Sequence, residues 1–425
     1  MNADDSIRLR RLIAFNPSKS EARGVSRDAS VTFLPMEAVS ELGDLDLSNT
    51  KPLLDVYNGY TYFRSGDVVV AKITPCFENG KGALIPDLAT GIGFGTTEFH
   101  VLRPSHRIVG RYLSYVTRSV PFRSLGAAEM KGAAGQQRVP EDFIRDFRIP
   151  LPAITTQQAI ADYLDEKTAD LDALIAKKRK LLDLLAEERA ALINQAVTKG
   201  LDSNMPMKNS GIPWIGGIPA HWKIKRLKLT CRLETGHTPS RTEPSYWVEE
   251  ECVIPWVSLN DTKTLVEHDT ITETRYQVSP RGMANSSAHL IDAGAVVFTR
   301  DASIGLAATT TRPMAVSQHI IAWVCGPQLL NWYLLRVIAA MQQELDSLTF
   351  GATLKTIGMG AVREMATPLP PIREQVRIVA FLVTELDRMT ALRKNIEKQL
   401  DRLQEYRQAL ITAAVTGQLD IGAAA

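Results

Sequence analysis

One segment of this chain occurs twice. Residues 150–202 and 368–420 align without a gap at a constant offset of 218 positions, and 23 of the 53 aligned positions are identical. Each copy begins with Pro-Leu-Pro and ends with an Ala-Val-Thr motif followed by Leu-Asp. Solenoid repeats are roughly 20–45 residues long, so a period this long excludes a solenoid. The sequence therefore predicts a single duplication in which each copy closes one half of the chain.

Each copy predicts a long helix. Residues 156–198 contain neither Gly nor Pro, and apolar side chains recur at the 3.5-residue spacing of a coiled-coil seam. The predicted seam consists of Ile160, Leu164, Leu171, Leu174, Leu181, Leu185 and Leu192 in the first copy and of Ile378, Leu382, Met389, Leu392, Ile396, Leu403, Tyr406 and Leu410 in the second. Gly200 and Gly417 are typical C-terminal caps. Two similar helices in one chain most simply pair with each other as an antiparallel coiled coil.

The residues that precede each copy share a predicted order of elements but little identity. The order is a strand with a proline near it, a Gly-led strand that ends in a base, a strand pair and an amphipathic helix. These elements fall at 31–36, 66–72, 82–85 with 98–102, and 108–118 in the first half, and at 253–257, 294–300, 305–309 with 319–324, and 329–345 in the second. We therefore expect an α+β protein, in which two globular α/β domains are separated by two long helices in a pseudo-two-fold arrangement.

These patterns predict five regions. The first domain is expected at 1–149, the first helix at 150–202, a linker at 203–221, the second domain at 222–367 and the second helix at 368–420. No stretch approaches the roughly 18 apolar residues of a membrane span, and the chain starts with two acids and no apolar run, so we expect a cytoplasmic protein. Four isolated cysteines without histidines at ligand spacing indicate neither a zinc site nor a disulfide framework.

The duplication itself suggests a kind of ligand. Two domains that keep one scaffold but differ in surface residues, joined by rigid spacers, suit the reading of two different sites at a fixed separation on one extended ligand. Double-stranded DNA is the obvious ligand of that kind, and a net charge of +2 neither demands nor excludes it. The alternative is a duplicated scaffold that holds two protein partners without DNA specificity.

The chain resembles the specificity (S) subunits of type I restriction-modification systems. The resemblance covers nearly the whole length and rests on the doubled Pro-Leu-Pro entry, AVTKGLD at 196–202 and AVTGQLD at 414–420. It also rests on WIGGIPAHWKIKRLK at 214–228 and GHTPS at 236–240. The first half departs from this pattern, because it opens with residues 8–16 and lacks the Trp-containing lead.

The resemblance implies two target-recognition domains, each reading one part of a split, asymmetric DNA sequence, with the paired helices setting the spacer between them. It further implies docking of two modification subunits that carry S-adenosylmethionine and methylate adenine. Restriction subunits that use ATP and Mg²⁺ would join that core. No cofactor and no metal is expected in this chain itself, which would be non-catalytic.

The residues also argue against catalysis. Asn16-Pro17 lacks the second proline and the aromatic residue of an amino-methyltransferase loop, and the alternating glycines at 91, 93 and 95 do not form a phosphate-binding GxGxxG. Asp87 and Glu98 resemble a nuclease acidic pair, but His100 stands where that motif has lysine. Ser48 and Lys51 fit SxxK only by spacing.

Candidate DNA-binding residues are polar or basic side chains at strand ends and in Gly-bracketed loops. In the first domain they are Lys72, Thr74, Asn79, Lys81, Thr97, Lys131, Gln136, Gln137 and Arg138; in the second they are Arg241, Arg300, Ser303, Gln318, His319, Thr353 and Lys355. Lys72 and Arg300 are preferred because they follow equivalent strands. Their competing interpretation is a buried salt bridge to an acid such as Asp67 or Asp301.

Overall fold

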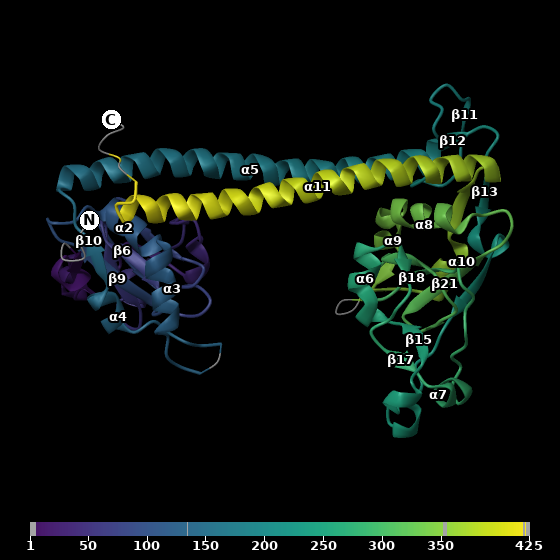
Figure 1. Ribbon diagram of the computed structural model, residues 1–425, viewed down its shortest axis with the longest axis horizontal. Coiled ribbons are helices and arrows are strands. Elements are labelled where there is room, and N and C mark those ends of the chain that lie inside the picture. Colours follow the sequence, from purple (N-terminus) through teal and green to yellow (C-terminus); the bar gives the residue numbers. More distant parts are fainter. Residues whose placement is uncertain (1–5, 134, 352–354, 420, 422–425) are drawn as a thin grey trace. The chain divides into compact units, whose positions relative to one another are not determined.

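The computed structural model describes residues 6–133, 135–351, 355–419 and 421. The chain divides into two compact units (Figure 1). Unit 1 comprises residues 1–179 and 397–425, and unit 2 comprises residues 180–396. Each unit contains one globular α+β part together with one half of each long helix, so the predicted fold class is confirmed.

The two long helices are α5 (Ile154–Lys199) and α11 (Ile372–Val415). Within unit 1 they pair in an antiparallel manner, because Arg407 Nε donates to Asp172 Oδ1 at 2.8 Å, whereas Lys178, further along α5, donates to Gln399, earlier in α11. Gly417 has a φ of 72°, the left-handed conformation that commonly ends a helix.

Most of the predicted seam faces the interior. Ile160, Leu164, Leu185, Ile378, Leu382, Ile396 and Leu410 are buried, and Leu171, Leu192, Met389 and Leu403 are partly buried.

Four predicted seam positions are wrong, because Leu174, Leu181, Leu392 and Tyr406 are between 40% and 57% exposed. Leu174 and Tyr406 each lie one residue from a buried position, and one residue turns a helix by about 100°. Ile175 is buried in place of Leu174, and Arg407, paired with Asp172, is buried in place of Tyr406. The chain therefore places a buried ion pair where a pure heptad would place an apolar layer.

Unit 1 contains two four-stranded sheets, in the orders β2-β9-β6-β7 and β4-β3-β8-β5. The strands of the first are β2 (Ile13–Phe15), β9 (Phe99–Pro104), β6 (Val68–Ala71) and β7 (Gly82–Leu84), and all its pairs are antiparallel. The strands of the second are β4 (Thr50–Pro52), β3 (Ser30–Leu34), β8 (Ile92–Gly95) and β5 (Thr61–Arg64), with β3 and β8 parallel. All four residues of β6 are buried, as expected for a central strand.

Unit 2 repeats this plan with a five-stranded sheet, β14-β21-β18-β19-β16, and a three-stranded sheet, β17-β15-β20. The bounds are β14 (Cys231–Thr235), β21 (Ile320–Cys325), β18 (Val296–Thr299), β19 (Ala307–Thr310), β16 (Thr270–Ile271), β17 (Gln277–Val278), β15 (Ile254–Val257) and β20 (Ala315–Val316). The pair β15 and β20 is parallel, like β3 and β8 in unit 1. The central antiparallel trio β21-β18-β19 corresponds to β9-β6-β7.

Shorter elements complete both units. In unit 1 they are β1 (Ser6–Arg8), α1 (Leu53–Val56), α2 (Gly110–Arg118), α3 (Val120–Ala128), α4 (Glu141–Asp146) and β10 (Arg148–Pro150). In unit 2 they are β11 (Met207–Asn209), β12 (Gly217–Pro219), β13 (Lys223–Arg226), α6 (Thr262–Glu267), α7 (Pro280–Ala284), α8 (Asn331–Ala340), α9 (Gln342–Ser347), β22 (Thr349–Phe350), β23 (Thr356–Ile357), α10 (Met359–Glu364) and β24 (Ala366–Leu369). The single helix predicted at 329–345 is thus two helices that meet at Met341.

A buried glutamine joins each globular part to the helix that follows it. In unit 1, Gln157 Oε1 accepts from the Val109 amide at 2.8 Å, and Gln157 Nε2 donates to the carbonyl oxygens of Arg107 and Pro152. In unit 2, Gln375 accepts from the Leu330 amide and donates to Gln328 and Pro370 in the same way. Both glutamines are fully buried and occupy the same position of the repeat.

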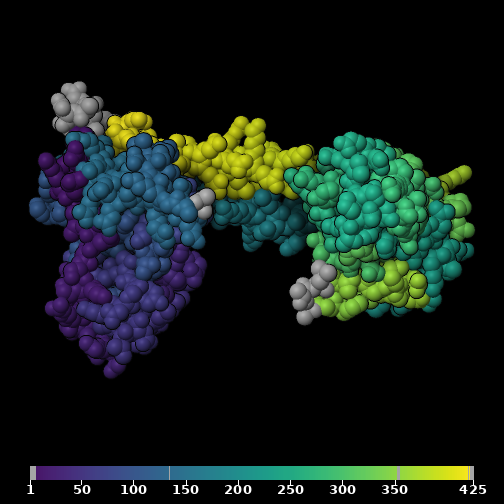
Figure 2. All heavy atoms as spheres, turned by 90° about the horizontal axis from the view of Figure 1, so that it is seen from below, coloured from purple at the N-terminus to yellow at the C-terminus, as the bar shows by residue number. Residues whose placement is uncertain are grey.

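A buried tyrosine joins each globular part to the end of the other helix. Tyr112 on α2 donates its hydroxyl to the carbonyl oxygen of Val415, or to that of Pro150, each at 3.2 Å. Tyr333 on α8 donates to the Val197 carbonyl at 2.9 Å. Val197 and Val415 are equivalent residues of the repeat. Figure 2 shows the C-terminal residues, in yellow, against the blue surface of unit 1.

We expect Gln157→Ala to lower the free energy of unfolding of unit 1 by about 1–3 kcal/mol, because it leaves a buried amide and two carbonyls without their partner. Urea denaturation followed by circular dichroism measures the loss. Gln158→Ala is the matched control, because Gln158 is the exposed neighbour on the same helix. Equal stability of the two variants would contradict the role given to Gln157.

Candidate nucleic-acid interface

Lys72 and Arg300 form backbone hydrogen bonds with residues at equivalent positions of the two units. The Lys72 amide donates to the Glu98 carbonyl at 2.9 Å, and the Arg300 amide donates to the His319 carbonyl at 3.0 Å. The carbonyls of Lys72 and Arg300 accept from the amides of Val139 and Ile357 at 2.8 and 2.9 Å. Lys72 and Arg300 therefore each lie at the end of a central strand. The backbone of each is hydrogen-bonded to the start of the neighbouring strand and to a second segment.

That second segment is a hairpin in unit 1 and brings several predicted residues together. Lys131 and Arg138 form a two-way backbone pair at 3.0 and 2.8 Å, and the Thr74 amide donates to the Gln137 carbonyl at 2.9 Å. Gln136 lies in the exposed part of the same hairpin. Lys72, Thr74, Lys131, Gln136, Gln137 and Arg138 thus form one cluster, named the Lys72 cluster below.

Glu98 lies within this cluster. Arg138 binds the Glu98 carboxylate through Nε and Nη2, both at 2.9 Å. The hydrogen bond from Arg138 lowers the pKa of Glu98, opposed by partial burial, and the nearby Lys72 ammonium lowers it further. Arg138 therefore already has an anionic partner, whereas Lys131 and Gln136 are exposed.

Asn79, Lys81 and Thr97 lie outside that hairpin. Asn79 donates to Glu41 at 2.7 Å and Lys81 donates to the Met36 carbonyl at 3.2 Å, so both side chains hold the segment around residues 36–41. Thr97 is exposed and lines a cavity beside Tyr60. The structure thus gives Asn79 and Lys81 a role in the fold that the sequence did not indicate.

In unit 2 the equivalent cluster is organised around Asp301, whose side chain is 6% exposed. Its carboxylate accepts from His319 Nδ1 at 2.6 Å and from the Thr356 hydroxyl, and lies 3.5 Å from Arg300 Nε. Gln318 Nε2 is 3.2 Å from His319 Nε2, and its oxygen accepts from the Thr238 hydroxyl. These bonds fix the directions of His319 and Gln318 at the rim of the sheet.

Two of the remaining predicted residues of unit 2 lie beside Asp301. Ser303 and Lys355 are exposed and flank Asp301, since the Ala302 amide donates to the Lys355 carbonyl at 2.9 Å. Arg241 lies apart from this cluster, in a cavity lined by Trp247, Trp256 and Tyr276. Thr353 lies outside the described residues.

The two competing salt bridges differ. Asp67 is fully buried and binds Arg103 through two bonds, at 2.7 and 2.9 Å, so its partner is Arg103 and not Lys72. Arg300 does approach Asp301, but at 3.5 Å and through one nitrogen. The guanidinium of Arg300 therefore keeps donors for a second acceptor.

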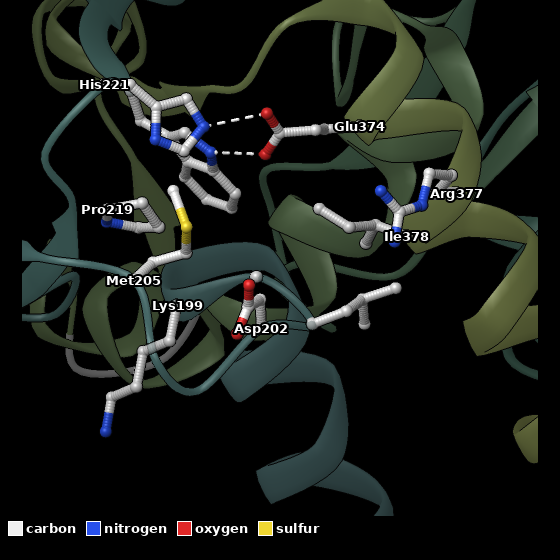
Figure 3. Close-up of a pocket in the computed structure, with 11 residues that line it drawn as sticks. Lys199, Asp202, Met205, Pro219, His221, Glu374, Arg377 and Ile378 are labelled. Carbon is white, nitrogen blue, oxygen red and sulfur yellow. Dashed lines mark hydrogen bonds and ion pairs between the residues drawn. The ribbon is translucent and has the colours of Figure 1, made fainter.

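A small cavity of about 160 Å³ lies where α5 ends and α11 begins, both within unit 2 (Figure 3). Glu374 accepts from Trp222 Nε1 at 2.8 Å and lies 2.8 Å from His221 Nε2. The lining also includes Lys199, Asp202 and Arg377, drawn around it in Figure 3. Both oxygens of Glu374 are used in fixing the Trp222 segment to α11, so the arrangement indicates a structural joint.

The motifs that resembled catalytic sites have other partners. Glu98 is bound by Arg138, Lys51 Nζ lies 3.9 Å from the centre of the Phe33 ring, and the Ser48 amide donates to Asp46. Among the described residues, no group of three or more His, Cys, Asp or Glu could hold a metal ion. In the same part of the chain, no helix has both the length and the apolar character that crossing a membrane requires.

Sequence reasoning missed the anchoring roles of Gln157 and Gln375. The available signal was a polar residue that stays identical in both copies while its neighbours differ. It also missed the exposed aromatic residues Tyr60 and Tyr276, which only the fold brings next to other predicted residues.

Comparison with known proteins gives consistent matches. Residues 219–402 match the family described as "Type I restriction modification DNA specificity domain". The type I restriction enzyme EcoAI specificity subunit of Escherichia coli is 42% identical over 155 residues, which are 36% of this chain and 26% of that protein. The putative MjaX specificity subunit of Methanocaldococcus jannaschii is 21% identical over 360 residues, 84% of this chain and 79% of that protein. The matches to the EcoAI and EcoEI subunits span about a quarter of those proteins, 26% and 23%.

Solved structures show the same fold. A chain from a structure of a type I R-M system superposes with a TM-score of 0.73 at 21% identity, covering 97% of this chain and 98% of that one. The crystal structure of the HsdS subunit from Thermoanaerobacter tengcongensis superposes with a TM-score of 0.56 at 17% identity, covering 97% of each chain.

We expect the stability of unit 1 to fall as the pH drops below about 6.5. Burial lowers the pKa of His100, whose Nε2 bonds the Val139 carbonyl at 3.1 Å while Nδ1 is buried without a partner among the described residues. The unfolded chain therefore binds a proton at a higher pH than the folded chain. The stability is complete above the unfolded pKa and is lost as the pH falls toward the lower folded value.

Thermal melting at pH 7.5 and pH 5.5 checks this expectation. The loss on acidification should be smaller in His100→Gln, whose amide can still donate to Val139. The exposed His106 provides the control substitution, His106→Gln. An unchanged loss in His100→Gln would contradict the assignment.

Proposed function

We propose that this chain is the DNA-recognition subunit of a type I restriction-modification complex, because residues 219–402 match the specificity domain of such systems and the chain is similar to several specificity subunits. Each globular part reads one half of a bipartite, asymmetric DNA target. The paired helices set the number of unspecified base pairs between the halves. The chain carries no catalytic step of its own and acts in the cytoplasm.

The observation that carries the proposal is that equivalent backbone hydrogen bonds in the two units are surrounded by different side chains. Lys72 and Arg300 have equivalent backbone bonds, yet their surroundings differ: Glu98 and Arg138 in unit 1, Asp301 and His319 in unit 2. Side chains at equivalent positions of the two globular parts would thus present different patterns of hydrogen-bond donors and acceptors to base edges. A scaffold for two protein partners gives no reason for this difference at strand ends.

The partners follow from the family. We infer that two modification subunits, which hold S-adenosylmethionine, dock on the helices and the adjoining surfaces. Restriction subunits that require ATP and Mg²⁺ join that complex. In this assembly the present chain recognises the DNA sequence, and the modification subunits catalyse methyl transfer.

Co-expression of the chain with the genes that neighbour its own, followed by mapping of methylated adenines, tests the proposal. A split motif with a fixed spacer is expected. Methylation at an unsplit motif, or none with an active modification subunit, would count against the proposal and favour a scaffold.

Arg300→Ala should weaken or relax recognition of one half-site and leave the other intact, because a good bidentate base contact contributes about 1–3 kcal/mol. Lys72→Ala should affect the other half-site. The readout is the base preference at each position of the methylated motif. Equal effects of either variant on both half-sites would argue against a local contact.

Insertion of seven residues into both α5 and α11 should lengthen the spacer by about three base pairs. Seven helical residues rise about 10 Å, and a heptad keeps the apolar register of the seam. The half-sites should stay the same in the methylation map. A change in the half-site sequences would contradict the proposed division of labour between helices and globular parts.

A further inference from the structure

Two cavities occupy the same place in the two units. The parallel pair β3 and β8 sets Phe33 opposite Phe94, and the parallel pair β15 and β20 sets Trp256 opposite Ala315. Phe94 lies five residues before β9 begins, and Ala315 lies five residues before β21 begins. Phe33 and Trp256 are therefore equivalent, and each lines a cavity, of about 510 Å³ and 440 Å³ respectively.

A polar side chain stands four residues after each of these aromatics. Glu37 follows Phe33, Asn260 follows Trp256, both side chains are exposed, and both line their cavities. Within the described chain, no ion pair involves Glu37, and the amide of Asn260 has only a weak contact, 3.4 Å to Ser258 Oγ. Each cavity thus has a polar group available for a ligand.

Aromatic rings form part of the other walls. In unit 1, Tyr60 is 38% exposed and packs edge-on against Phe33 with ring centres 5.0 Å apart. In unit 2, Tyr276 is 48% exposed, and Trp247 packs edge-on against Trp256 at 6.0 Å. Both indole nitrogens already donate to backbone carbonyls, at 2.9 and 3.2 Å, so these rings have only their apolar surfaces to offer.

A cation lies near two aromatic rings of the cavity in unit 1, and another lines the cavity in unit 2. Lys51 Nζ lies 3.9 Å from the centre of the Phe33 ring and 5.8 Å from that of Tyr60. Arg241 lines the cavity of unit 2, and no ion pair of Arg241 occurs in the described part of the chain. Aromatic walls, one hydrogen-bonding group and an adjacent cation match the ring, the edge and the phosphate of a nucleotide.

Resting on the proposed function, we propose that each cavity receives one nucleobase turned out of the duplex, and that Glu37 and Asn260 select that base. A base can stack on a protein ring only after it leaves the duplex stack. The Glu37 carboxylate accepts hydrogen bonds, so it selects a base that presents N–H donors, such as the exocyclic amino group of cytosine, adenine or guanine. Asn260 both donates and accepts, which matches adenine.

The first test uses the complex reconstituted with its modification subunits and the motif mapped for the unaltered chain. Glu37→Gln should change the accepted base at one position of one half-site, and Asn260→Asp should do so at one position of the other. Asp55→Asn and Glu267→Gln, exposed acids in the same two units, are the controls and should leave the motif unchanged. Unchanged preference in Glu37→Gln and Asn260→Asp overturns the proposal.

The second test measures duplex binding with a mismatch placed at the selected position. Binding should tighten, because a mismatched base costs less to extrude. Tyr60→Ala and Tyr276→Ala should weaken binding roughly tenfold or more, each sensitive to the mismatch in one half-site only. If the variants change the base preference but a mismatch does not tighten binding, the proposal that the base leaves the duplex is wrong. If the unaltered complex methylates no split motif, the proposed function fails instead.

Discussion

The structure depends on buried hydrogen bonds that attach each globular part to two helices at once. A glutamine amide side chain satisfies one backbone amide and two carbonyls where each helix begins, and a tyrosine hydroxyl reaches the last turn of the other helix. Buried backbone groups without partners are costly, so these bonds fix the angle at which the helices leave the sheets.

The buried strands are alike in the two units, whereas the side chains at the strand ends differ. The strands that end just before Lys72 and Arg300 are fully buried, and the backbone partners of these two residues lie at equivalent positions in both units. Change in this core would cost packing energy, whereas change at the strand ends alters only which groups face outward. The two units accordingly share the central antiparallel strands and the parallel strand pair, and they differ in the acid near these strand ends, Glu98 in one and Asp301 in the other.

Periodicity was enough to predict the two long helices, and the order of strands followed from their alternation with Gly-rich turns. The predicted seam was wrong at Leu174, Leu181, Leu392 and Tyr406, because spacing alone does not show which apolar residues of a long helix are buried. The helix predicted across Met341 failed because its break depends on packing and not on Gly or Pro.

The candidate site was less predictable than the fold. Strand alignment correctly paired Lys72 with Arg300, yet nothing local revealed that Asn79 and Lys81 hold a distant segment. The cavity walls come from residues more than twenty positions apart, such as Phe33 and Tyr60, which only tertiary structure unites. Which of the candidate residues contact DNA remains a prediction.

The boundary between the units has a consequence for biosynthesis. Unit 2 is one continuous stretch of chain, but the core of unit 1 includes Ile411, Ala414, Val415 and Ile421 from the far end of the sequence. Chains are made from the N-terminus, and domains generally fold as units once complete. The residues of unit 1 that precede α5 are therefore synthesised before unit 2 but complete their core after it. Unit 1 can close its core only after the chain has been synthesised beyond Ile421.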